Sequence, residues 1–130
     1  MAGRKVTELL SVSPQITEDD VEAIKAAGFR SIICNRPDGE EPGQTDFESV
    51  RAAAAASGLE VRYQPVLSGG LQQQDVDAFA SLTEELPTPI FAYCRSGTRC
   101  IMLWAHAEAR KRPLPEVLEM TRKAGYDLGV

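Results

Sequence analysis

Short apolar runs rich in β-branched residues alternate with stretches of helical periodicity, and this alternation limits the folds that the chain can adopt. We expect strands over residues 8–13, 29–34, 60–66 and 89–93. Between and after them, apolar residues recur at helical spacing, and Gly, Pro or Asp clusters separate the segments. Because this order favours right-handed β-α-β crossovers, we predict an α/β fold with a mostly parallel central sheet of about four to five strands flanked by helices.

Capping and breaking residues set the expected limits of the helices. Thr17, with Asp20 three residues later, forms a variant capping box, and Gly28 ends the helix that follows. Thr45 with Glu48 is expected to open a second helix that runs to Gly58. The remaining helices are predicted over residues 73–85, 98–110 and 114–123.

Size and charge suit one small domain that binds an anion locally. With 130 residues, 43% of them hydrophobic, the chain is expected to form a single domain over residues 1–130. Residues 1–93 carry 7 Lys/Arg against 15 Asp/Glu, whereas residues 94–130 carry 7 against 4. An acidic chain with its cations gathered in one region is poorly suited to nucleic acid but can attract a small anion. A solvated basic face on the last helices would give the same pattern.

Cysteine usage and hydropathy indicate a cytoplasmic protein. No window approaches eighteen consecutive uncharged apolar residues, so we expect neither secretion nor a membrane partner. The three cysteines, Cys34, Cys94 and Cys100, are odd in number and lack the C-x-x-C spacing of zinc sites. They are therefore expected to be thiols in a reducing compartment. With one histidine, His106, the chain offers no ligand cluster, and no metal or organic cofactor is expected.

Three loops follow predicted strands at the edge of the sheet where α/β proteins place their sites. They comprise residues 35–44, 67–72 and 94–97. The first has ten residues, more than a connection needs. We therefore expect the functional residues in these three loops.

Cys94 stands between a predicted buried strand and a predicted helix. Gly97 allows the backbone to curl there, so that several N–H groups and the positive end of the helix dipole point at one spot. Such surroundings lower a cysteine pKa from about 8.5 to roughly 4–7, which makes the thiolate nucleophilic. We predict that Cys94 is a catalytic nucleophile acting on an anionic group and that Arg99 binds the oxyanion, the alternative being a buried, inert Cys94. Substrate contacts are also expected from Arg95, Ser96, Gly97 and Thr98.

The residues around this cysteine carry a family resemblance. Residues 93–99 (YCRSGTR), with residues 35–39 (NRPDG) upstream, resemble the bacterial beta-lactamase hydrolase-like, protein phosphatase-like domain family. The likeness covers nearly the whole chain, including residues 13–16 and 75–79. It implies a fold like that of the cysteine-dependent dual-specificity phosphatases, in which a cysteine attacks phosphorus and the resulting phosphocysteine is hydrolysed by water. It also implies Cys94 as nucleophile and Arg99 as phosphate-binding arginine.

The loop departs from the phosphatase pattern at three points. Four residues separate Cys94 from Arg99, where those phosphatases have five. Tyr93 stands where they usually carry histidine, and Cys100 stands where they carry a serine or threonine hydroxyl. Four intervening residues are similar to the loop of rhodanese-type sulfurtransferases, which hold a cysteine persulfide. Three interpretations therefore stay open: a phosphatase-like hydrolase, a sulfurtransferase acting on a persulfidated or similar small partner, and a catalytically silent anion-binding regulatory module.

A phosphatase of this kind also uses a carboxylic acid to protonate the leaving oxygen, a step worth about 10²- to 10⁴-fold. Asp38, in the long loop, is the first candidate, with helix capping or loop bonding as the alternative. Asp75 and Asp77, in the first turn of a predicted helix, are the others. Arg36 is expected to be a second anion contact, with a salt bridge to Asp38 or Glu40 as the alternative.

Several further residues are expected to be structural. Cys34 and Cys100 are expected in buried packing, although a protective disulfide between Cys34 and Cys94 is conceivable if their strands are neighbours. Trp104 is expected in the core behind the loop. His106 lies about 12 Å along its helix from Thr98, at about 1.5 Å per residue, which argues against a Cys–His dyad.

Overall fold

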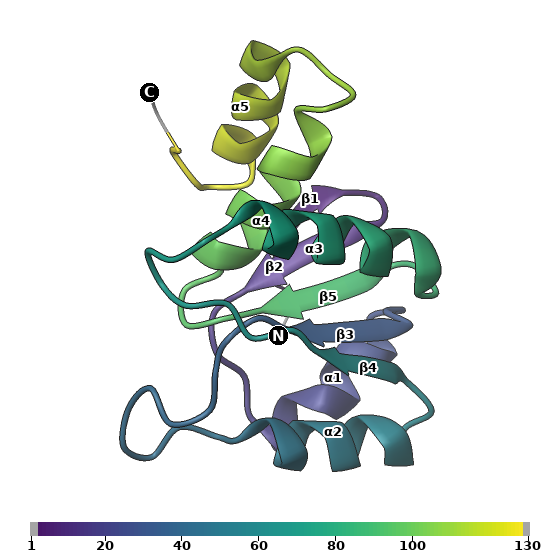
Figure 1. Ribbon diagram of the computed structural model, residues 1–130. Coiled ribbons are helices and arrows are strands. Elements are labelled where there is room, and N and C mark those ends of the chain that lie inside the picture. The colour runs from purple at the N-terminus through teal and green to yellow at the C-terminus, as the bar shows by residue number, and fades with distance from the viewer. Residues whose placement is uncertain (1–2, 129–130) are drawn as a thin grey trace.

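The computed structural model describes residues 3–128 and shows one twisted sheet between two layers of helices (Figure 1). The strands are β1 (Arg4–Thr7), β2 (Leu10–Ser13), β3 (Ser31–Cys34), β4 (Glu60–Tyr63) and β5 (Ile90–Tyr93). The helices are α1 (Val21–Ala26), α2 (Phe47–Ala56), α3 (Gln73–Glu85), α4 (Thr98–Glu108) and α5 (Leu114–Lys123), with a 3₁₀ turn at Glu18–Asp20 before α1. None of the helices within residues 3–128 is long and apolar enough to cross a membrane.

The sheet has the order β1-β2-β5-β3-β4 and is parallel except for β1. This confirms the predicted α/β fold with a mostly parallel sheet. The first predicted strand, residues 8–13, is too long, because residues 8–9 form a turn between β1 and β2. The sequence did not predict β1, because this edge strand is short and begins with two exposed charged residues, as edge strands often do.

The ends of the other elements differ from the predictions by a few residues. The capping box at Thr17 is confirmed, since its N–H donates to the Asp20 carboxylate at 2.9 Å. Asp46 caps α2 in place of Thr45, accepting the N–H of Ser49 at 2.9 Å. Strand β4 ends before Pro65, which has no N–H to offer a neighbouring strand. Helix α4 ends at Glu108 rather than at residue 110, whereas α3 and α5 have the predicted limits.

The two faces of the sheet carry separate apolar clusters, and β5 contributes to both. Ile90 and Ala92 pack on the face covered by α3 and α4, whereas Phe91 and Tyr93 pack on the face covered by α1 and α2 (Figure 1). Cys94 follows this alternation and lies in the α3/α4 cluster. The predicted core position of Trp104 is confirmed, since its 7% exposed side chain belongs to the same cluster. The central strand therefore delivers Cys94 to the carboxyl edge of the sheet, beneath α4.

Candidate active site

The loop from β5 to α4 requires glycine at residue 97. Gly97 has φ of +93°, a backbone conformation that side chains disfavour. A Cβ at this position would also lie 2.1 Å from the Tyr126 hydroxyl oxygen. That hydroxyl donates to the Ser96 carbonyl at 2.8 Å, so the segment after α5 holds the loop in place. No local sequence signal connects Tyr126 with this loop, which lies thirty residues away.

Hydrogen-bond donors converge on the sulfur of Cys94. The Gly97 N–H donates to Sγ at 3.1 Å. The pKa of Cys94 falls from the ordinary 9.0 to about 5, chiefly because the Cys100 thiol donates to it, with backbone donors at Cys100, Ser96 and Gly97 adding to the effect. Desolvation acts in the opposite direction and is outweighed. Cys94 is therefore a thiolate at neutral pH, in the environment that makes a cysteine nucleophilic.

Cys100 contributes a hydrogen bond to Cys94 in addition to packing in the core. It lies in the first turn of α4, fully buried. Burial raises its pKa well above 9.0, so it stays a neutral thiol that can donate to the Cys94 sulfur. Only packing was expected for Cys100, so this hydrogen bond was not predicted. Cys100 directly follows Arg99, where the resembling phosphatases carry a hydroxyl donor, and this position was the sequence feature that could have indicated it.

Arg99 joins segments that follow three of the parallel strands at the carboxyl edge of the sheet. Its side chain is 10% exposed. Nη1 and Nη2 donate to the two carboxylate oxygens of Glu40, each at 2.8 Å, and Nη1 also donates to the Val66 carbonyl at 2.9 Å. The loop of residues 35–44 and the segment after β4 thus meet the cysteine loop, as the rule for parallel sheets predicts.

Glu40 bridges two arginines. Besides Arg99, it accepts from Arg36 Nε at 2.9 Å. Its pKa falls from 4.5 to about 2, first because Arg99 donates to it and then because Arg36 does, against the effect of burial. From the sequence, Glu40 was expected only as a possible partner of Arg36. A link to Arg99, 59 residues away, has no sequence signal apart from the unusual length of the loop.

The three nitrogens of the Arg36 guanidinium are all engaged. Nε reaches Glu40, Nη2 reaches Glu41 at 2.9 Å, and Nη1 reaches the side-chain oxygen of Gln15 at 3.1 Å. The residue is 1% exposed. These contacts favour the salt-bridge alternative over a direct role of Arg36 as an anion contact.

The candidate acids make structural contacts in this structure. The Asp38 carboxylate accepts the N–H of Phe47 at the start of α2, at 2.8 Å, which favours the capping alternative. The Asp75 carboxylate accepts the N–H of Gln72 at 2.9 Å and so caps α3. Asp77, on the same helix, pairs with Arg110 Nη2 at 2.7 Å.

Of the remaining candidates, Ser96 contributes its backbone donor to the Cys94 sulfur. Arg95 is exposed, and the Ser96 hydroxyl donates to the Thr98 hydroxyl at 2.9 Å. His106 is exposed on α4, in agreement with the expectation that it forms no dyad with Cys94.

Cys34 and Tyr93 lie on the opposite face of the sheet from Cys94. Strands β3 and β5 are neighbours, with Cys34 paired to Tyr93. Both of these side chains, however, pack in the α1/α2 cluster, whereas Cys94 belongs to the α3/α4 cluster. Desolvation raises the pKa of the Cys34 thiol, which donates to the Arg36 carbonyl at 3.3 Å. This arrangement favours buried packing of Cys34 over a disulfide with Cys94.

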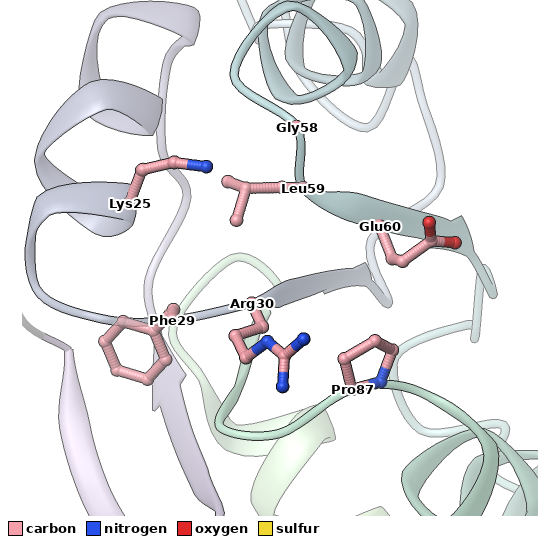
Figure 2. A pocket seen from close by; sticks show the side chains of 7 residues that line it. All are labelled: Lys25, Phe29, Arg30, Gly58, Leu59, Glu60 and Pro87. Atoms are coloured by element: carbon pink, nitrogen blue, oxygen red, sulfur yellow. The ribbon is translucent and has the colours of Figure 1, made fainter.

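A shallow pocket of about 310 Å³ lies away from this site (Figure 2). Its lining residues belong to α1, to the segments that lead into β3, β4 and β5, or to the first residue of β4, so it lies at the amino edge of the sheet, opposite Cys94. The Lys25 ammonium and the Leu59 side chain point toward one another across it (Figure 2). Its lining holds no cysteine, serine, threonine or histidine and consists of Lys25, Phe29, Arg30, Gly58, Leu59, Glu60 and Pro87.

The family model and the curated relatives indicate one family. The family model for the beta-lactamase hydrolase-like protein, phosphatase-like domain matches residues 3–111. A beta-lactamase hydrolase-like protein of Agrobacterium fabrum is 33% identical over 130 residues, which are 98% of this chain and 30% of that protein. The chain thus spans about a third of the length of this relative.

Solved structures extend the likeness to the fold. A candidate phosphatase from Neisseria meningitidis Z2491 is 39% identical, with a TM-score of 0.88 over 98% of this chain and 92% of that one. Kinase associated phosphatase, solved with its catalytic cysteine replaced by serine, has a TM-score of 0.71 at 15% identity, over 92% of this chain and 78% of that one. The fold is therefore that of the protein phosphatases. The chain belongs to the phosphatase-like domain family of the beta-lactamase hydrolase-like proteins.

Proposed function

We propose that the chain is a cysteine-dependent, phosphatase-like hydrolase that acts on a small phosphate-type anion, with Cys94 as its nucleophile. The observation that carries the proposal is the position of the Cys94 sulfur just before α4, where the Gly97 N–H donates to it and the Cys100 thiol lowers its pKa. A thiolate held in this way attacks electrophilic centres, and the loop amides and helix dipole favour an anionic substrate.

The reaction proceeds in two displacements. The Cys94 thiolate forms a bond to phosphorus, and the bond from phosphorus to the leaving oxygen breaks. A water molecule then attacks the phosphocysteine, releasing inorganic phosphate and restoring the thiolate. The Cys100 thiol assists this second step, because a donor to the Cys94 sulfur makes that sulfur a better leaving group.

Arg99 stabilises the charge that spreads over the transferred group. Its guanidinium lies next to the cysteine loop and presents a planar fork, which matches two oxygens of a tetrahedral anion. The exposed Arg95 adds positive charge at the entrance without requiring a fixed contact.

Asp38 is the proposed acid, which requires its carboxylate to leave the Phe47 N–H for the substrate. Protonation matters most for a poor leaving group. An Asp38→Asn variant should therefore lose more activity on an alkyl phosphate than on an activated aryl phosphate, whereas Asp75→Asn and Asp77→Asn lose equally little on both. Equal losses on the two substrates in Asp38→Asn would remove Asp38 from the mechanism.

Access to the sulfur is the most demanding requirement of the proposal, because Cys94 is 0% exposed. An anion must reach it past the exposed Arg95 and Ser96. Iodoacetamide tests this directly. Native protein should be alkylated at Cys94, and inorganic phosphate should slow the reaction. A native protein in which iodoacetamide never reaches Cys94 would contradict the enzymatic proposal.

A second candidate function is sulfur transfer, which the four-residue spacing between Cys94 and Arg99 favours. Here the Cys94 thiolate attacks the outer sulfur of thiosulfate, the sulfur–sulfur bond of thiosulfate breaks, and sulfite leaves. Cyanide then takes the outer sulfur of the persulfide as thiocyanate and restores the thiolate.

Paired assays on wild type and Cys94→Ser separate the functions. Phosphate release from an aryl phosphate between pH 5 and 8 supports the hydrolase. Thiocyanate formation, with one added sulfur on the intact mass of wild type only, supports the transferase. Anion binding without either turnover supports the third interpretation, a silent anion-binding regulatory module.

A further inference from the structure

Asn35 carries a buried oxygen that no group within residues 3–128 satisfies. The residue lies directly after β3 and is 0% exposed. Its Nδ2 donates to the Gln64 backbone carbonyl at 2.9 Å and to Oε1 of the same residue at 3.3 Å. Its Oδ1 has no hydrogen-bond partner in this part of the chain. Because a buried acceptor without a donor is costly, Oδ1 calls for a donor that the chain itself does not supply.

The orientation of the Asn35 amide follows from the two acceptors that its nitrogen meets. Exchanging Nδ2 and Oδ1 would place an oxygen against two oxygens of Gln64, which is repulsive. Gln64 is itself held by α3, since its Nε2 donates to the Asp75 carbonyl at 2.9 Å. The nitrogen arm of the amide is therefore fixed on Gln64, and the oxygen arm points away from it.

Sheet pairing places Asn35 beside Cys94. Strands β3 and β5 are parallel with Cys34 paired to Tyr93, and the Asn35 N–H continues this ladder by donating to the Tyr93 carbonyl at 2.9 Å. Cys34 and Tyr93 both pack in the α1/α2 cluster. The next residue on each strand therefore faces α3 and α4, the side on which Cys94 packs. Asn35 and Cys94 thus lie side by side on one face of the sheet.

The backbone of Asn35 contacts the segment that follows β4 at the same edge. The Val66 N–H donates to the Asn35 carbonyl at 3.0 Å, and the Val66 carbonyl accepts from Arg99 Nη1 at 2.9 Å. Asn35 therefore lies between Cys94 and the segment that contacts Arg99. The Gly97 N–H and the Arg99 guanidinium are donors at this edge, whereas Asn35 Oδ1 is an acceptor.

We propose that Asn35 Oδ1 accepts a hydrogen bond from an O–H of the bound anion, so that the site selects a protonated oxyanion over a fully ionised one. Hydrogen phosphate and the monoanion of a phosphate ester carry such an O–H at neutral pH, whereas sulfate and thiosulfate have acceptors only. A sulfate ion would leave Oδ1 unpaired and bring oxygen against oxygen. The inference rests on the proposed function, in that the substrate is a phosphate-type anion, and adds the residue that distinguishes this anion from sulfate.

The test compares inorganic phosphate with sulfate on the wild-type protein. Dissociation constants are measured at pH 6 by isothermal titration calorimetry, and protection of Cys94 against iodoacetamide shows that the ion binds beside it. Because sulfate carries more charge than phosphate at this pH, charge alone predicts tighter binding of sulfate. We expect wild type instead to bind phosphate about 10- to 100-fold more tightly, the effect of one buried acceptor that only phosphate satisfies.

Variants at Asn35 and Gln64 assign the preference to a single atom. Asn35→Leu keeps the approximate volume of the side chain but removes the acceptor, and the two dissociation constants should then agree within about 3-fold. Gln64→Ala is the matched control, because it removes the Gln64 side-chain contacts but leaves Oδ1 and the contact of Nδ2 with the Gln64 backbone carbonyl. It should keep the preference for phosphate. Asn35→Ala replaces Asn35→Leu if the latter does not fold.

The outcomes that overturn the inference differ from those that overturn the hydrolase. Wild-type protein that binds sulfate at least as tightly as phosphate contradicts the role of Asn35 and leaves the hydrolase standing. An Asn35 variant that keeps the full preference does the same, and so does a Gln64→Ala variant that loses it to the same extent as Asn35→Leu. Wild-type protein that binds neither ion contradicts both the role of Asn35 and the proposed hydrolase.

Discussion

The two loops that meet at Arg99 work by different means. The loop of residues 94–97 is short and acts mainly through its backbone, since the Gly97 N–H points at the Cys94 sulfur and Gly97 has the required positive φ. The loop of residues 35–44 is long and acts through side chains, since Glu40 reaches across to Arg99 and Arg36 donates to Glu40.

This difference decides what each loop contributes. Backbone donors at a helix start are held by the fold, so the first loop provides a fixed electrostatic environment for the thiolate. Side-chain ion pairs can be replaced one at a time, so the second loop adjusts the orientation of the Arg99 guanidinium. We therefore expect substitutions in the loop of residues 94–97 to abolish the proposed activity, and substitutions in the loop of residues 35–44 to reduce it in part.

Replacing the nucleophile should have the largest effect. Cys94→Ser removes the thiolate, and we expect the proposed phosphatase activity to fall at least about 10³-fold, to the background of the assay. The matched control is Cys34→Ser, which also removes a buried thiol at the end of a neighbouring strand but on the other face of the sheet. Turnover in Cys94→Ser equal to that of Cys34→Ser would eliminate the first loop as the site of chemistry.

Arg99→Lys should be the next largest, because lysine keeps the charge but loses the planar fork. We expect kcat/KM to fall about 10²- to 10³-fold, the cost of removing one preorganised donor at an oxyanion. Arg95→Lys is the control, since Arg95 is exposed and only its charge is used. Similar losses of kcat/KM in both variants would show that only the positive charge of Arg99 matters, and not the planar geometry of its guanidinium.

The same contrast explains how much the sequence could predict. The strands other than β1, the helices and the position of Cys94 between β5 and α4 follow from local patterns, namely apolar periodicity and the glycine at residue 97. Glu40 and Tyr126 act through contacts over 59 and 30 residues, and local patterns carry no information about such pairings. Asp38 is an intermediate case, because its loop was identified but the direction of its carboxylate depends on where α2 begins.

Removing the Cys100 thiol should raise the pKa of Cys94 from about 5 toward the ordinary 9.0, because this thiol is the largest of the influences that lower it. Since a raised pKa leaves less thiolate at low pH, Cys100→Ala should be alkylated by iodoacetamide about 5- to 10-fold more slowly than wild type at pH 6, with a smaller difference at pH 9.

Cys100→Ser keeps a donor at the same position and serves as the control. Its profile should lie closer to wild type than that of Cys100→Ala. Identical profiles for all three proteins would mean that the backbone of the first loop ionises Cys94 without help from this side chain.

The smallest expected effect is on the free energy of unfolding, through Glu40 in the loop of residues 35–44. Glu40 has a pKa of about 2 in the folded protein against an ordinary 4.5, because Arg99 and Arg36 donate to it. A lowered pKa in the folded state adds stability that is fully present above about pH 4.5 and is lost as the pH falls toward 2. Glu40→Gln imitates the protonated form, so at pH 6 it should unfold with about 1 to 3 kcal/mol less free energy than wild type, after allowance for partial exposure. Urea unfolding at pH 6 and pH 3 should show this gap narrowing at the lower pH, because wild-type Glu40 then begins to bind a proton in the unfolded chain. A difference in unfolding free energy that stays constant between the two pH values would mean that the charge of Glu40 does not stabilise its contacts with Arg36 and Arg99. The second loop would then hold Arg99 through packing rather than through charge.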